Sequence, residues 1–222
     1  MSPSARQQSV HALRSRYFSD AKPALLELFD PRQLRILDLG CGGGHNGALL
    51  KRAGARWVGG VELNAGACVA ARQRLDAVAQ CDLAEFDPTA FGPEPYDAIL
   101  ASDVLEHLAE PELVLSRAVT HLRPGGIVVT SIPNVAHVYV FANLLLQRWP
   151  RKTSGIFDST HVRFFGKRNM IELLEGCGLR VLRVKPYYTR YRLIRAACLV
   201  ISLCVFRDYW ARQFLLLADK PG

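Results

Sequence analysis

The stretch that most constrains this chain is RILDLGCGGGHNGALL, residues 35–50. An apolar run ends in Asp38-Leu39-Gly40, five glycines follow within residues 40–47, and a helix-like pattern begins at His45. We interpret this order as a strand, a tight turn and the start of a helix. Glycines in such a turn permit positive φ and let a ligand approach the backbone. The helix start adds free N–H groups and the positive end of a dipole. The stretch therefore predicts a binding site for a small polar ligand.

The glycine turn contains two overlapping motifs. Gly42-x-Gly44-x-x-Gly47 matches the dinucleotide fingerprint, which is weak on its own. Gly40-x-Gly42 is preceded by Asp38, whose negative charge would repel a pyrophosphate and attract a cationic ligand. We therefore favour the Gly40-x-Gly42 motif. In this interpretation Gly44 and Gly47 only ease the packing of the helix against the sheet.

Apolar strand-like runs alternate with helix-like patterns along the chain. This alternation predicts a doubly wound α/β sheet. The expected strands are 35–39, 57–63, 77–81, 96–102, 127–132, 179–184 and 213–218, and the expected helices are 22–29, 45–53, 65–75, 110–122, 136–148 and 167–177.

Two acids follow the next strands. Glu62 ends the second strand about 20 residues after the glycine turn, where an open α/β sheet places the carboxylate that binds a ribose diol. That position suits NAD and S-adenosylmethionine equally. Asp82 ends the third strand, where a carboxylate can accept a hydrogen bond from an adenine amino group. Together with Asp38, these acids favour S-adenosylmethionine, which carries a sulfonium and an ammonium, over NAD, which carries two phosphates.

Five motifs in order resemble the class I S-adenosylmethionine-dependent methyltransferases across nearly the whole chain: ILDLGCGGG, VGGVEL, QCDLAEF, YDAILASDVLEHL and LRPGGIVVTSIPN. The resemblance implies a Rossmann-like, seven-stranded, mostly parallel sheet, with the last strand antiparallel beside the fifth. It implies S-adenosylmethionine as cofactor and gives each cofactor residue a role. By this resemblance, Gly40 and Gly42 lie along the methionine moiety, and its ammonium is held by Asp38, directly or through water, and by the Ser102 carbonyl. Glu62 binds the ribose and Asp82 binds the adenine. Leu63 and Leu83 flank these two acids.

The acceptor half of the site is predicted from a narrower resemblance. DSTHVRFF (158–165) and SIPNVAHV are similar to a bacterial methyltransferase subgroup associated with surface-polysaccharide glycosyltransferases. This implies O-methylation of a sugar or a lipid-linked glycan precursor. The alternatives left open are a quinone-type acceptor, RNA, and a non-catalytic regulator or scaffold that only binds the cofactor.

Methyl transfer needs mainly alignment of nucleophile, methyl and sulfur, but an oxygen acceptor can also need a base. Imidazole titrates near neutrality, so His161 and His107 are our candidate catalytic residues, and His137 is a weaker one. Each has a structural alternative: His107 could hydrogen-bond at a helix start, and His161 could orient the substrate loop. Asp103, Glu106 and His107 have the i, i+3, i+4 spacing of a divalent-metal site. Some metal-using ubiquinone-pathway O-methyltransferases are similar here, but this chain has Asp103 in place of a Glu and no second acid after Glu106. We therefore expect no metal.

Charge is concentrated in one region. Residues 148–195 carry 12 Lys/Arg against 3 Asp/Glu, whereas residues 1–147 carry 13 against 15. The basic and aromatic segment 149–168 could bind RNA, but no RNA-binding module accompanies it, so an anionic small molecule or a glycolipid headgroup is favoured over nucleic acid.

We expect one domain over residues 1–222: an N-terminal brace or lid (1–34), a cofactor-binding half (35–135), and a substrate lid with the basic loop and C-terminal strands (136–222). No signal peptide is recognisable, and the six scattered cysteines predict reduced thiols in a cytoplasmic protein. The apolar run 198–206 is too short to span a membrane. It predicts a packed helix or, with the arginines before it, peripheral contact with the inner membrane face. The oligomeric state is not predicted.

Overall fold

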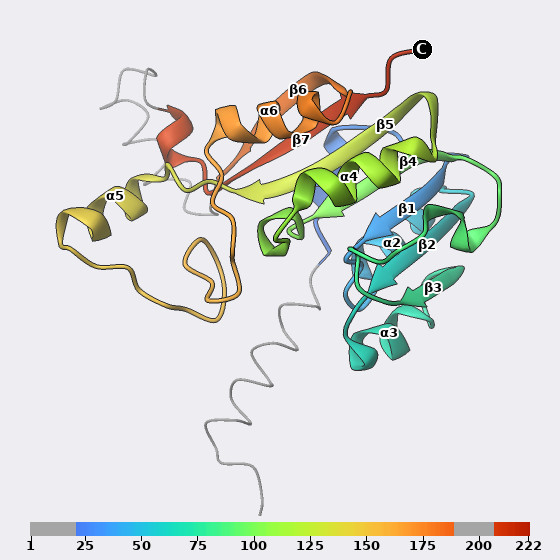
Figure 1. Ribbon diagram of the computed structural model, residues 1–222, viewed down its shortest axis with the longest axis horizontal. Helices are drawn as coiled ribbons and strands as arrows, with labels where there is room; N and C mark the ends of the chain where they lie inside the picture. Colours follow the sequence, from blue (N-terminus) through green and yellow to red (C-terminus); the bar gives the residue numbers. More distant parts are fainter. Residues whose placement is uncertain (1–20, 189–206) are drawn as a thin grey trace, which may run out of the picture.

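The structure is a computed structural model that describes residues 21–188 and 207–222. Seven strands form one sheet in the order β3-β2-β1-β4-β5-β7-β6 (Figure 1). Their bounds are Arg35–Leu39 (β1), Trp57–Glu62 (β2), Ala77–Gln80 (β3), Tyr96–Ser102 (β4), Leu122–Pro133 (β5), Arg180–Tyr187 (β6) and Gln213–Asp219 (β7). β7 lies antiparallel between β5 and β6, which confirms the predicted fold class. The N-terminal part of the expected brace (1–20) and the apolar run 198–206 lie outside the described residues.

The helices connect the strands as the alternation predicted, with shorter bounds. They are α2 (His45–Arg52), α3 (Ala65–Ala71), α4 (Pro111–Thr120), α5 (Val138–Leu145) and α6 (Lys167–Gly176), with 3-10 helices η1 (Pro23–Glu27), η2 (Pro88–Phe91), η3 (Leu105–His107) and η4 (Arg207–Trp210). Among the described residues, no helix is both long and apolar enough to cross a membrane.

Each face of the sheet carries its own hydrophobic core. Alternate residues of a strand point to opposite faces, so in β4 Ile99 belongs to one core and Leu100 to the other. Helices α4 and α6 cover the first face, and η1, α2 and α3 cover the second (Figure 1). The result is a three-layer α/β/α arrangement that fixes the positions of the strand ends.

Three boundaries differ from the sequence-based expectation. The fifth strand begins at Leu122, which pairs with Tyr96, and not at residue 127. The third helix ends at Ala71 because residues 72–76 turn back to the sheet, where Asp76 accepts a hydrogen bond from the Val58 N–H at 2.8 Å. The helix expected over 136–148 covers only Val138–Leu145. Tertiary contacts, which local patterns do not reveal, set the first two limits.

The strand order places the functional site. β1 pairs with β2 on one side and with β4 on the other, so the connections leave β1 in opposite directions. In an open α/β sheet, a crevice forms at the carboxyl ends of the two strands that flank such a switch point. Here those ends lead into Gly40 after β1 and Asp103 after β4.

Candidate active site

A cavity of about 710 Å³ opens at this crevice. It is lined by the β1–α2 turn, the end of β2, the residues after β3 and β4, and part of the loop 149–166. The structure brings most predicted site residues to this cavity: Gly40, Gly42, Glu62, Leu63, Asp82, Leu83, Ser102 and His107 all line it. Asp38 and His161 lie behind its surface, and both side chains are buried. The predicted site residues therefore gather at one crevice, with Asp38 and His161 in the layer behind the cavity wall.

The glycine turn has the backbone conformation that its sequence implies. Gly40 has φ +66°, and a Cβ added there would come 2.5 Å from Cγ2 of Val104. Gly42 also has positive φ, at 54°. At Gly47 in α2, an added Cβ would come 2.3 Å from Leu75, so this glycine lets the helix pack closely. The interpretation of Gly40-x-Gly42 as the ligand turn and of Gly47 as a packing residue agrees with this geometry.

Glu62 ties the glycine turn to the end of β2. Its Oε2 accepts a hydrogen bond from the Gly42 N–H at 3.0 Å, and its Oε1 accepts one from the Asn64 N–H at 2.8 Å. A carboxylate oxygen can accept more than one hydrogen bond. The backbone donors therefore fix the orientation of Glu62 and leave it acceptor capacity for a diol.

Asp82 lies at the far end of the same edge. Its Oδ1 accepts a hydrogen bond from the Ala84 N–H at 2.9 Å, which orients an otherwise exposed carboxylate beside the buried Leu83. An acceptor next to an apolar side chain suits an aromatic base that carries an amino group. This is the geometry expected of an adenine site.

Asp38 occupies a buried position beneath the glycine turn. Among the described residues, its Oδ2 has no hydrogen-bond partner. Burial, and secondarily the nearby charge of Glu62, raise the pKa of Asp38 to about 8. The carboxyl is therefore largely protonated at neutral pH in the ligand-free protein. A cation bound above the turn would favour its ionised form.

A polar cluster follows β4 at the other wall of the cavity. Asp103 has a positive φ of 54°, which is uncommon outside glycine. Its carboxylate is ion-paired with Lys22 and accepts hydrogen bonds at 2.9 Å from Ser131 Oγ and Gln213 Nε2. Ser102 joins the cluster through a 3.0 Å contact between its Oγ and that of Ser131. Four segments far apart in sequence thus hold this wall.

His107 lies on η3 and faces the cavity. Its Nδ1 lies 3.2 Å from the carbonyl oxygen and 3.1 Å from Oγ1 of Thr160. A carbonyl oxygen can only accept, so Nδ1 carries the proton and Nε2 is the basic nitrogen of the neutral ring. The Thr160 hydroxyl in turn donates to Oδ1 of the buried Asp158 at 2.7 Å. The chain Asp158–Thr160–His107 fixes the tautomer and orientation of the imidazole.

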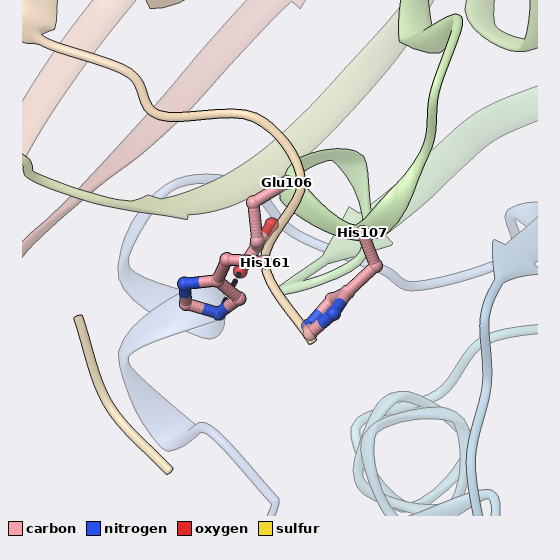
Figure 2. A group of neighbouring side chains, drawn as sticks. All are labelled: Glu106, His107 and His161. Atoms are coloured by element: carbon pink, nitrogen blue, oxygen red, sulfur yellow. Dashed lines mark ion pairs between the residues drawn. The ribbon is translucent and has the colours of Figure 1, made fainter. Parts of the chain in front are cut away.

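His161 packs beside His107, as Figure 2 shows. The two ring centroids are 4.7 Å apart in an edge-to-face arrangement, and the His161 side chain is only 4% exposed. Its Nε2 lies 3.9 Å from Oε1 of Glu106. Burial lowers the pKa of His161, and burial together with Asp103 raises the pKa of Glu106 well above its usual value. Both shifts favour the uncharged forms of the two side chains.

The predicted metal set is only partly brought together. Glu106, His107 and His161 each offer a ligand atom, and these atoms lie within 4.8 Å of one another (Figure 2). Asp103, the first residue of the i, i+3, i+4 pattern, instead contacts Lys22, Ser131 and Gln213. His161 comes from a loop that the sequence pattern did not connect to this cluster. The absence of a metal stays a prediction.

The weaker candidate His137 lies outside the cavity lining and caps α5, where its Nδ1 accepts from the Tyr139 N–H at 3.0 Å. Burial, and secondarily Arg212, lower the pKa of His137 to about 4. In the neighbouring loop, the Arg163 guanidinium donates two hydrogen bonds to the Ala109 carbonyl. This contact pins the loop 149–166 to the segment after η3.

Sequence reasoning missed several lining residues: Lys22, His45, Asn46, Asn64, Thr153, Ser159 and Thr160. Asn64 had a signal, because it follows Glu62 and caps α3 through its side chain. Lys22 had none, because its partner Asp103 is 81 residues away.

The comparisons with known proteins agree with this geometry. A family model described as a methyltransferase domain matches residues 11–184. The chain belongs to the methyltransferase-domain family. The predicted enzyme class is thereby confirmed: this is a methyltransferase domain of the S-adenosylmethionine-dependent kind. The comparisons do not confirm the narrower resemblance to the subgroup associated with surface-polysaccharide glycosyltransferases.

Among curated relatives, a ubiquinone biosynthesis O-methyltransferase of Azorhizobium caulinodans is 32% identical over 68% of this chain and 66% of its own length. A trans-aconitate 2-methyltransferase of an Azoarcus species is 38% identical over 44% of this chain and 38% of its own length. Across the first relatives, the matched region spans between half and about 70% of their lengths. An S-adenosylmethionine-dependent methyltransferase structure from Mesorhizobium loti has a TM-score of 0.65 at 20% identity, covering 89% of this chain and 96% of that one. At that identity the likeness shows the fold alone.

The cavity residues fit S-adenosylmethionine. Glu62 and Asp82 line the same cavity as hydrogen-bond acceptors, which suits a ribose and a base with an amino group. The unpartnered Oδ2 of Asp38 beneath the glycine turn suits a cation bound above it. A pyrophosphate would meet a poor environment, because Lys22 is the one Lys or Arg among the described lining residues, against five acids: Glu62, Asp82, Asp103, Glu110 and Asp158.

Proposed function

We propose that this domain transfers a methyl group from S-adenosylmethionine to a hydroxyl oxygen of a small acceptor, and that the acceptor is a sugar or a lipid-linked glycan precursor. The observation that carries the proposal is that one cavity joins the cofactor acids to His107 and to a hydroxyl-bearing wall of Thr153, Ser159 and Thr160. Such a wall can exchange hydrogen bonds with an acceptor that is itself rich in hydroxyl groups.

The residues of the chain provide binding, alignment and one proton acceptor. The bound cofactor supplies an activated methyl group on a sulfonium. Glu62 and Asp82 hold the ends of the cofactor, and the glycine turn lets it lie close to the backbone. His107 takes the proton of the acceptor hydroxyl at Nε2, because Nδ1 is committed to Thr160. Asp158 stabilises the resulting imidazolium through the Thr160 hydroxyl.

His161 acts on the reaction through His107. Its ring packs against that imidazole and is itself held by the Ile156 carbonyl, 3.3 Å from Nδ1. Burial lowers the pKa of His161 and so favours its uncharged form, which places no positive charge beside the His107 ring. We therefore assign His161 the orienting role and His107 the base.

A second acceptor class is supported by a different observation. Several relatives are named for ubiquinone biosynthesis, and the cavity also has an apolar side made by Leu108, Leu113 and Val114. A hydroxylated quinone precursor would use this side for its ring and the same His107 for its hydroxyl.

The test measures release of S-adenosylhomocysteine from the whole chain with three acceptor sets: hydroxyl-rich sugars and lipid-linked glycans, hydroxylated quinone precursors, and RNA. Turnover with the first set supports the proposal, and turnover only with one of the others replaces the acceptor class. Cofactor binding with no turnover on a broad cell extract would support the regulator or scaffold function. Calorimetry supplies the control for the cofactor, since tighter binding of NAD than of S-adenosylmethionine would contradict the whole assignment.

A further inference from the structure

Helix α5 and the residues after it present an apolar surface that nothing in the described chain covers. We call this the α5 surface; its exposed members are Tyr139, Phe141, Leu144, Leu145, Leu146 and Trp149. Leu145 is 86% exposed and Leu146 is 65% exposed. Within α5 only Val140 is buried. An apolar helix that buries one residue and exposes most of the others is typical of a surface that contacts a partner or a membrane.

The α5 surface lies away from the sheet. Figure 1 shows α5 and the loop that follows it set apart from the strands, and α5 contacts η4 through the rings of Phe141 and Tyr209, whose centroids are 5.9 Å apart. Val140 packs with Ile156 and Phe157 in a small core of its own. Two rings clamp this core, because the Phe157 ring lies 4.9 Å from that of Trp149 and 5.5 Å from that of Tyr139. The exposed leucines are therefore presented on a folded platform.

The chain that follows α5 directly is basic, and the nearest acids are the buried Asp158, next to Phe157, and Asp208, next to Tyr209, which Lys167 pairs. The sequence contains no Asp or Glu from residue 113 to residue 157, whereas Arg148, Arg151 and Lys152 follow α5 directly and are exposed. Arg212 lies beside the same loop, since its Nη2 is 3.0 Å from a Cβ added at Gly155. An apolar surface that is followed by exposed basic residues is complementary to a bilayer, which has an apolar interior and can carry anionic headgroups.

These features select a lipid surface over a second copy of the chain. Helix α5 has eight residues, too few to span a bilayer but enough to lie in its interface. Tyrosine, tryptophan and arginine are the side chains that occupy the headgroup region. A second copy that used the same surface would bring two basic borders together, and their repulsion would oppose pairing.

We propose that the α5 surface docks this domain onto bilayers that contain anionic phospholipids, with Leu145 and Leu146 entering the acyl boundary and Arg148 and Arg151 contacting the headgroups. This site differs from the run 198–206, which the sequence suggested as a membrane contact and which lies outside the described residues. The proposal is independent of the acceptor, because it concerns lipid binding and not turnover.

The test is flotation of the full chain with vesicles of phosphatidylcholine alone and with vesicles that also contain phosphatidylglycerol. We expect binding to the mixed vesicles and little to the neutral ones. The double substitution Leu145→Glu with Leu146→Glu should reduce binding at least about tenfold, because it places two charges at the acyl boundary. The control Val69→Glu changes an exposed apolar residue on α3, at the opposite end of the molecule in Figure 1, and should leave binding unchanged.

A second pair of substitutions keeps the test decisive if the leucine variant does not fold. Arg148→Gln and Arg151→Gln should each weaken binding about fivefold, with no effect on the weak binding to neutral vesicles. Absence of flotation of the unaltered chain with anionic vesicles would overturn the proposal, as would equal binding to both vesicle types. A dimer that the leucine substitutions dissociate, without flotation, would assign the surface to a second copy and also overturn it.

Discussion

The cofactor half of the cavity, supplied by residues 35–102, and its acceptor half, formed by the residues after β4 and by the loop 149–166, are built by different kinds of contact. In the cofactor half the key polar groups follow successive parallel strands, and the Gly42–Glu62 hydrogen bond spans 20 residues of sequence. In the acceptor half the decisive contacts are longer in range: His107 meets Thr160 across 53 residues, and Asp103 meets Gln213 across 110. Parallel strands align their ends automatically, whereas a loop is positioned only by the contacts it makes.

The largest expected effect separates the two halves directly. His107→Gln should lower turnover at least about 100-fold, because it removes the proposed base, while S-adenosylhomocysteine binding stays within error. Steady-state kinetics and calorimetry measure the two quantities. His121→Gln, at the end of α4 and outside the cavity, is the control. A larger loss in His161→Gln than in His107→Gln would show that the roles of the two histidines are reversed.

The next effect probes the cofactor half alone. Glu62→Ala should weaken S-adenosylhomocysteine binding by about 1–3 kcal/mol, roughly 5- to 150-fold, because charge-assisted hydrogen bonds are lost. Calorimetric titration measures this, with Glu94→Ala as a matched control on an exposed carboxylate away from the cavity. Unchanged affinity would mean that Glu62 does not hold the ribose.

A smaller effect concerns the proton on Asp38. Its pKa is raised to about 8 in the folded protein from 3.8, so the folded state binds a proton that the unfolded state has released. Its stabilising contribution is complete below about pH 4 and is lost as the pH rises through about 8, with a slope of at most about 1.4 kcal/mol per pH unit. Buried Glu106 contributes with the same sign.

Denaturant unfolding between pH 5 and 8 measures this slope. Asp38→Asn mimics the protonated carboxyl and should flatten the dependence, leaving the part due to Glu106. Identical slopes in the unaltered chain and the variant would show that Asp38 is ionised throughout. Calorimetry in buffers of different ionisation enthalpy adds a second readout, since a cationic ligand should release a proton from Asp38.

Removal of metal ions is expected to have no effect. Treatment with a chelator should leave turnover and cofactor binding unchanged, because Asp103 is engaged by Lys22, Ser131 and Gln213 and the base needs no metal. Metal analysis of the purified chain is the companion measurement. Loss of turnover that Mg²⁺ restores would contradict this and assign a metal to Glu106, His107 and His161.

The difference between the halves also explains what the sequence could predict. The fold class, the antiparallel last strand and the cavity position were predicted correctly, because Gly40, Glu62 and Asp82 follow strands whose order the family pattern supplies. Asp38, which the resemblance places at the ammonium directly or through water, lies beneath the turn because alternation along β1 puts it on the same face as Ile36. Its role at the ligand stays a prediction.

The acceptor half was predicted only as a set of candidates. No local pattern could separate His107 from His161, because the distinction depends on how the loop 149–166 folds back on η3 through Arg163 and Thr160. The boundaries of α5 and the ion pair between Lys22 and Asp103 were also not predicted, because no local sequence pattern indicates them. The single-domain division over residues 1–222 stays a prediction.

The insertion of β7 between β5 and β6 has a consequence for the newly made chain. Gln213, on β7, donates to the same Asp103 carboxylate that Lys22 and Ser131 reach from other elements. Gln213 is synthesised long after the glycine turn, Glu62 and Asp82, so a nascent chain that already contains these residues still lacks this donor. The cofactor side can assemble during translation, but the acceptor wall is completed only after residue 213 has left the exit tunnel.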